Sequence, residues 1–144
     1  NTPPLVRESV RALAQKLGTL DDLAKWEKEL DSLEAEIIAG MQASGNIGSK
    51  AAVQFHHQAL ARWLGYDVVY VFGPGEMTMT QLKEIEALLP VIILDNWHMA
   101  QGEPLKKEGR RYVQLLNFPG AYGTSSILDV LRYNAKVLGI LGDR

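Results

Sequence analysis

Four short apolar runs, separated by segments with helical spacing, most strongly restrict how this chain can fold. They span 51–55, 68–72, 91–94 and 112–116. The second and third runs are continuous rather than alternating, which is typical of strands that helices bury on both faces. Strands that alternate with helices imply right-handed crossovers and a parallel sheet. The sequence therefore predicts an α/β fold with a four-stranded, mostly parallel sheet that is covered by helices.

Two further helices are predicted before the sheet begins. Apolar residues recur at steps of three and four over 5–17 and again over 20–38, and each series gives one apolar stripe. Gly40 is a candidate end for the second helix because glycine commonly terminates helices. We expect 1–43 to form these leading helices and 44–144 to form the parallel-sheet unit of a single lobe.

The composition excludes several classes of protein. Fifteen Lys and Arg against 17 Asp and Glu give a formal charge of −2, so no basic excess indicates a nucleic acid or an anionic membrane as partner. The chain has no cysteine, which rules out disulfides, thiolate metal sites and cysteine nucleophiles. A hydrophobic content of 47% is usual for a folded globular domain.

All three histidines follow predicted strands. His56 and His57 come after the first strand and His98 after the third, while Glu76 and Asp95 follow the second and third. The carboxyl ends of parallel strands meet at one edge of a sheet, where ligands of open α/β sheets bind. Imidazole and carboxylate groups suit Zn²⁺ or Mn²⁺. These five side chains are therefore candidates to converge on a metal ion.

Simpler interpretations stand beside this one. Adjacent residues of a strand point to opposite faces, so His56 and His57 cannot both face one ion from a strand. A hydrogen-bonded loop histidine accounts equally well for His98. The basic run at 106–111 contains Glu108, which favours a solvated face over a phosphate site.

The order of segments is similar to a known family. The segment 53–60, VQFHHQAL, followed by a Gly at 65, resembles the C-terminal lobe of the zinc/manganese substrate-binding proteins of ABC transporters, the metal receptors with a helical backbone. In that family a His or Glu after the first strand is a metal ligand, and His57 matches that position. The family's second ligand in this lobe is an Asp after the fourth strand, where this chain has Asn117. His56 and His98 are further candidate ligands.

The resemblance implies a binding protein and not an enzyme. It implies a solute-binding lobe that captures a divalent transition metal, such as zinc or manganese, for delivery to an ABC permease in the membrane. The remaining ligands would come from an N-terminal lobe that this sequence does not include, so the chain is expected to be a fragment of a two-lobe receptor. The expected location is periplasmic or extracellular, with a lipid anchor on another segment as one option.

Two alternatives remain open from the sequence. One is a metal-dependent hydrolase that uses His56, His57 and Asp95 around a zinc-bound water. The other is a non-catalytic interaction domain with the same architecture.

Overall fold

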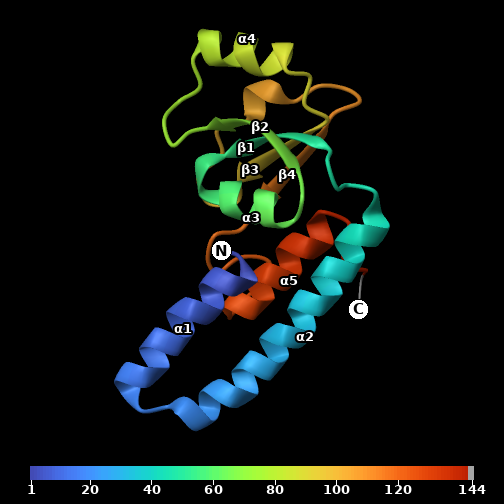
Figure 1. Ribbon diagram of the computed structural model, residues 1–144. Helices are drawn as coiled ribbons and strands as arrows, with labels where there is room; N and C mark the ends of the chain where they lie inside the picture. Colours follow the sequence, from blue (N-terminus) through green and yellow to red (C-terminus); the bar gives the residue numbers. More distant parts are fainter. Residues whose placement is uncertain (143–144) are drawn as a thin grey trace.

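A parallel β-sheet forms the centre of the protein in the computed structural model, which describes residues 1–142 (Figure 1). Its strands are β1 (Lys50–Gln54), β2 (Asp67–Phe72), β3 (Ile92–Asn96) and β4 (Arg111–Leu115). They lie in the order β2-β1-β3-β4, and every neighbouring pair is parallel. The predicted α/β fold is confirmed. The third strand runs two residues further than its apolar run because Asp95 and Asn96 pair with Gln114 and Leu115 of β4.

Helices cover both faces of this sheet. The α-helices are α1 (Pro3–Leu17), α2 (Leu20–Ser44), α3 (Gln58–Trp63), α4 (Met79–Ala87) and α5 (Ile127–Val137), and the short 3-10 helices are η1 (Phe55–His57), η2 (Trp97–Met99) and η3 (Glu103–Leu105). On one face, α2, α3 and α5 bury Leu33, Leu60 and Leu131 against the sheet. On the other face, α4 and η3 bury Ile85 and Leu105. The sheet is therefore buried on both sides, as its continuous apolar runs predict.

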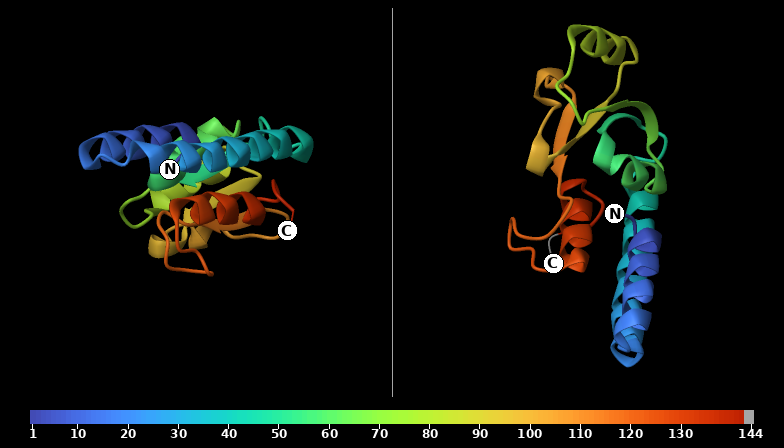
Figure 2. Two further views of the ribbon diagram at one scale, coloured as in Figure 1. Left: turned by 90° about the horizontal axis from the view of Figure 1, so that it is seen from below. Right: turned by 90° about the vertical axis from the view of Figure 1, so that its left-hand side faces the viewer.

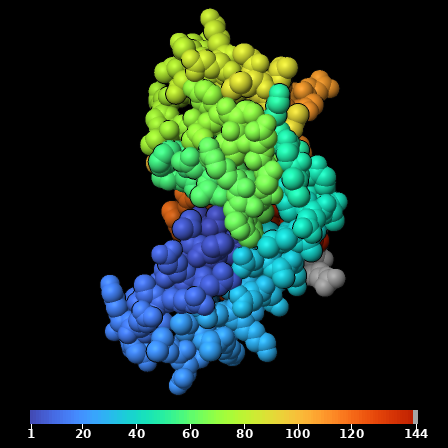
Figure 3. Space-filling model, in the orientation of Figure 1, coloured from blue at the N-terminus to red at the C-terminus, as the bar shows by residue number. Residues whose placement is uncertain are grey.

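The two leading helices form a hairpin that extends past the sheet (Figures 2 and 3). α1 ends at Gly18, whose φ of 69° lies in the left-handed region that favours glycine. Arg7 of α1 then pairs with Asp31 at 2.7 Å and with Glu34 at 2.6 Å on α2. These pairs fix the register of the two helices.

Gly40 does not end α2, so the prediction of a helix end there is wrong. The helix continues to Ser44, and Gly45, with a φ of 74°, caps it. A Cβ atom at position 40 would collide with the backbone oxygen of Ile140. Glycine at this position therefore allows the segment after α5 to pack directly against the helix.

The predicted solvated face at 106–111 is wrong for Arg110, which is buried. Its guanidinium donates to Glu86 at 2.6 Å and to the backbone oxygens of Pro90 at 3.0 Å and Leu105 at 3.1 Å. Hydrogen bonds from Arg110 and Lys107 lower the pKa of the Glu86 carboxyl to about 2. This buried cation therefore ties α4 to the loop before β3 and to η3.

Candidate metal-binding site

The three histidines lie where the connections of the sheet reverse direction. β1 and β3 are neighbours at its centre, and the chain continues from β1 to β2 on one side and from β3 to β4 on the other. Ligands of open α/β sheets bind at such a switch point, outside the carboxyl ends of the strands. η1 follows β1 and carries His56 and His57, and η2 follows β3 and carries His98. The topology thus brings all three histidines to one edge.

Two matching turns hold His56 and His98. Gln54, the last residue of β1, accepts a hydrogen bond through its side-chain oxygen from the backbone N–H of His56 at 2.8 Å. Asn96, the last residue of β3, does the same for His98 at 3.0 Å. Each turn has a buried amide, an aromatic residue and a histidine in succession. Sequence reasoning missed the two amides, although this repeated order of residue types could have revealed them.

His57 is the most deeply buried of the three histidines. Its side chain lies in a residue that is 2% exposed, and its Nε2 atom has no hydrogen-bond partner among the residues the structure describes. Burial, the nearby N-terminal ammonium group and His56 lower the pKa of His57 to about 4, against an opposing hydrogen bond with Asn96. At neutral pH the imidazole is therefore uncharged, as a metal ligand must be.

His98 resembles His57 in one respect. It is half-buried, and its Nδ1 atom is buried without a hydrogen-bond partner in residues 1–142. Its ring packs on Phe118 with a centroid distance of 3.7 Å and lies perpendicular to Trp97 at 5.0 Å. His56 differs from both, because its side chain is exposed and its ring meets that of Phe55 edge-on at a centroid distance of 5.5 Å.

Asn117 lies at the same edge, two residues after the end of β4. It is half-buried, and its backbone oxygen accepts a hydrogen bond from the side-chain amide of Asn1. The start of the chain is thereby held beside the loop that follows β4. A side-chain amide at this position offers an uncharged oxygen donor, which is a weaker ligand than a carboxylate.

Asp95 does not join the histidines. Successive residues of a strand face opposite sides of the sheet, and Asp95 shares the face of α4 and η3 while Asn96 points to the other. Its carboxylate accepts hydrogen bonds from the backbone N–H groups of Asn96 at 2.8 Å, Gln101 at 3.1 Å and Gly102 at 2.7 Å, and from the Tyr112 hydroxyl. These bonds occupy its acceptor sites, so the set His56, His57 and Asp95 is not assembled.

Glu76 also lies apart from the histidines. It is exposed in the loop after β2 and lines a separate hollow with Met77 and Gln101. Within residues 1–142, no three histidine, aspartate or glutamate side chains are grouped so that they could hold a metal ion. Zinc sites in proteins have three or four protein ligands. The switch point therefore offers His57, with His98 and Asn117 at the same edge of the sheet, as candidates for part of a site and not for a whole one.

Comparison of the chain with models of protein families and with curated proteins finds no significant match. Among the helices of the described residues, none has the length and apolarity needed to cross a membrane.

Proposed function

We propose that this chain is a solute-binding lobe of an ABC-transporter receptor for a divalent transition metal such as zinc or manganese, with His57 as its principal ligand. The single observation that carries the proposal is the buried Nε2 atom of His57 at the switch point of the sheet, which lacks a hydrogen-bond partner within residues 1–142. Buried polar atoms without partners are rare in proteins and call for an explanation. A metal ion that is bound during the working cycle provides one.

The lobe binds its metal without catalysis in this proposal. The neutral imidazole of His57 donates its lone pair, while His98 and Asn117 supply neighbouring nitrogen and oxygen atoms. A second lobe completes the coordination shell and the metal then passes to a membrane permease, outside the cytoplasm. The resemblance of 53–60 to the metal receptors supports this function. The hydrolase stays an alternative, and its set of His56, His57 and Asp95 would require Asp95 to leave the backbone N–H groups that donate to it.

Calorimetric titration of the chain with Zn²⁺ and with Mn²⁺ tests the proposal. We expect weak binding, because the lobe holds only part of the shell. His57→Gln should weaken it at least about tenfold, since a ligand is lost, and His98→Gln should weaken it less. His56→Gln is the matched control, because this neighbour is exposed, and it should bind as the unmodified chain does.

Two results would overturn this assignment. The first is a His57→Gln variant that keeps its fold by circular dichroism and binds metal as tightly as the unmodified chain. The second is a larger loss of affinity in His56→Gln than in His57→Gln.

A further inference from the structure

β4 is an edge strand with one side open. The backbone N–H of Arg111 donates to the oxygen of Val91 at 3.1 Å, and the paired register continues along β3. Because backbone groups alternate in direction along a strand, Arg111, Val113 and Leu115 point their N–H and C=O groups at β3. Tyr112 and Gln114 point theirs away from the sheet. Their backbone groups have no hydrogen-bond partner among the described residues.

The end of this open row is already closed by a side chain. The next outward residue is Leu116, whose N–H donates to Oδ1 of Asn134 at 2.8 Å and whose oxygen accepts from Nδ2 of Asn134 at 2.9 Å. Asn134 is buried, so its amide occupies the place where a fifth strand would pair. The open part of the row is therefore limited to the outward backbone groups of Tyr112 and Gln114.

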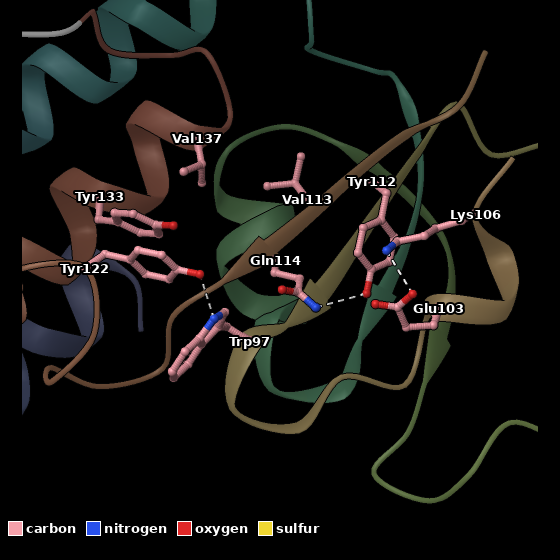
Figure 4. A pocket seen from close by; sticks show the side chains of 9 residues that line it. All are labelled: Trp97, Glu103, Lys106, Tyr112, Val113, Gln114, Tyr122, Tyr133 and Val137. Carbon is pink, nitrogen blue, oxygen red and sulfur yellow. Dashed lines mark hydrogen bonds and ion pairs between the residues drawn. The ribbon is translucent and has the colours of Figure 1, made fainter. Parts of the chain in front are cut away.

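A cleft of about 340 Å³ runs along the same edge (Figure 4). The side chains of Tyr112, Val113 and Gln114 all line it, although successive side chains of a strand point to opposite faces. One cleft can contact side chains from both faces only at an open edge of the sheet. That edge is the outer side of β4, because β3 pairs with its inner side. The cleft therefore gives direct access to the open backbone groups.

The two walls of the cleft differ in chemistry. Tyr133 and Val137 of α5 stand with Val113 on one side, so this wall combines two aliphatic side chains with a tyrosine. Tyr112 and Gln114 stand with Glu103 and Lys106 on the other, as Figure 4 shows. Lys106 and Glu103 form an ion pair at 2.8 Å, so the polar wall carries no net charge. Trp97 closes one end and donates through Nε1 to the Tyr122 hydroxyl at 2.9 Å.

We propose that the open edge of β4 binds an extended peptide segment of a partner protein as a fifth strand. The segment pairs with the N–H and C=O groups of Tyr112 and Gln114, which is the bonding that strand addition uses. Its side chains alternate, with an apolar residue against Val113 and Val137 and an uncharged polar residue beside Gln114. The uncharged polar wall favours a segment without net charge. This inference is independent of the metal site.

Amide hydrogen exchange followed by NMR tests the pairing directly. The probe is a blocked six-residue peptide in which valine and threonine alternate, added to the unmodified chain. Exchange at the amides of Tyr112 and Gln114 should slow by at least about tenfold at saturation, because new hydrogen bonds protect them. The amides of Arg111 and Val113 already bond to β3 and should not change.

Methylated peptides and a proline variant sharpen the test. Two control peptides carry N-methyl groups on every second backbone nitrogen, one on the odd-numbered residues and the other on the even-numbered residues. Binding should be lost for the peptide whose methyl groups replace the N–H groups that point at β4, and it should be kept for the other peptide. Gln114→Pro, which removes one outward N–H at a position where an edge strand tolerates proline, should weaken binding about tenfold. Gln114→Thr keeps the N–H and should bind normally.

Three results would overturn the proposal. The first is no binding of the probe at millimolar concentration. The second is equal binding of both methylated peptides, which would exclude backbone pairing. The third is protection of Tyr112 and Gln114 without peptide together with a dimer in sedimentation, which would assign the edge to a second copy of this chain.

Discussion

Asp95 and His57 are two buried polar side chains near the carboxyl ends of adjacent strands, and their surroundings differ sharply. Asp95 is 0% exposed and accepts hydrogen bonds from three backbone N–H groups and one tyrosine hydroxyl. His57 is 2% exposed, and its Nε2 atom has no partner in residues 1–142. The buried carboxylate of Asp95 is therefore fully hydrogen-bonded, whereas the buried imidazole of His57 is not.

This difference distinguishes a polar group that holds the fold, Asp95, from one that we propose to bind a metal ion, His57. A satisfied buried carboxylate holds the segments that donate to it, here the loop around Gln101 and Gly102. The buried Nε2 atom of His57, which lacks a hydrogen-bond partner in residues 1–142, costs free energy in the folded protein. Loss of Asp95 should therefore damage stability, and loss of His57 should damage binding alone.

The largest expected effect comes from Asp95→Ala. The change leaves the buried donors of Gln101, Gly102 and Tyr112 without an acceptor, and each such group costs about 1–3 kcal/mol. We expect the free energy of unfolding in guanidinium chloride to fall by about 3–5 kcal/mol. Glu76→Ala, in an exposed loop, is the control and should change it by less than about 0.5 kcal/mol. A loss below about 1 kcal/mol in Asp95→Ala would break the comparison.

Arg110 provides a second test on the same face. Arg110→Met removes a buried cation that binds Glu86 and two backbone oxygens, and we expect a loss of about 2–3 kcal/mol, less than for a wholly buried pair because Glu86 is partly exposed. The pKa of Glu86 is lowered to about 2. The stabilisation that the Glu86 carboxylate contributes is therefore present above about pH 4.5 and is lost as the pH falls toward 2.

Variants of Glu86 isolate this pH dependence. Glu86→Gln should flatten the decline in unfolding free energy between pH 4.5 and 2, measured by denaturant titration at several pH values. Glu108→Gln, an exposed carboxylate close in sequence, should leave the decline unchanged. An unaltered decline in Glu86→Gln would show that other carboxylates cause it.

His57→Leu should have the smallest effect on stability. Leucine fills the site without a buried unpaired nitrogen, so we expect the free energy of unfolding at pH 7.5 to change by less than about 1 kcal/mol. The unmodified chain should lose stability as the pH falls from about 6.5 to 4, because the unfolded histidine binds a proton more readily than the folded one, whose pKa is about 4. His57→Leu should lose less over that interval. A loss above about 2 kcal/mol at pH 7.5 would mean that His57 is structural.

The sequence predicts the layers of this fold better than its contacts. The continuous second and third runs predict strands that are buried on both faces, and the alternation of strands with helices predicts that the sheet is parallel. Gly40 and Arg110 were misinterpreted because their roles depend on distant partners, the Ile140 backbone and Glu86. No local pattern in the sequence records such contacts.

The candidate site was predictable to the same degree. The position of each histidine after a strand predicts its edge of the sheet, since parallel strands end together. The direction in which each side chain points could not be predicted in this way, because it depends on where each strand ends. Asp95 could be separated from His57 only after the end of β3 was known, because the strand continues through two polar residues.

The central claim is that Nε2 of His57 is the atom that binds the metal. Long-range ¹H–¹⁵N NMR of the histidine rings, recorded with and without saturating Zn²⁺, tests it most directly because it resolves each ring nitrogen. We predict a shift of the His57 Nε2 resonance on addition of Zn²⁺ and no shift in the ring of His56. A shift confined to His56, with His57 unchanged, would contradict the claim.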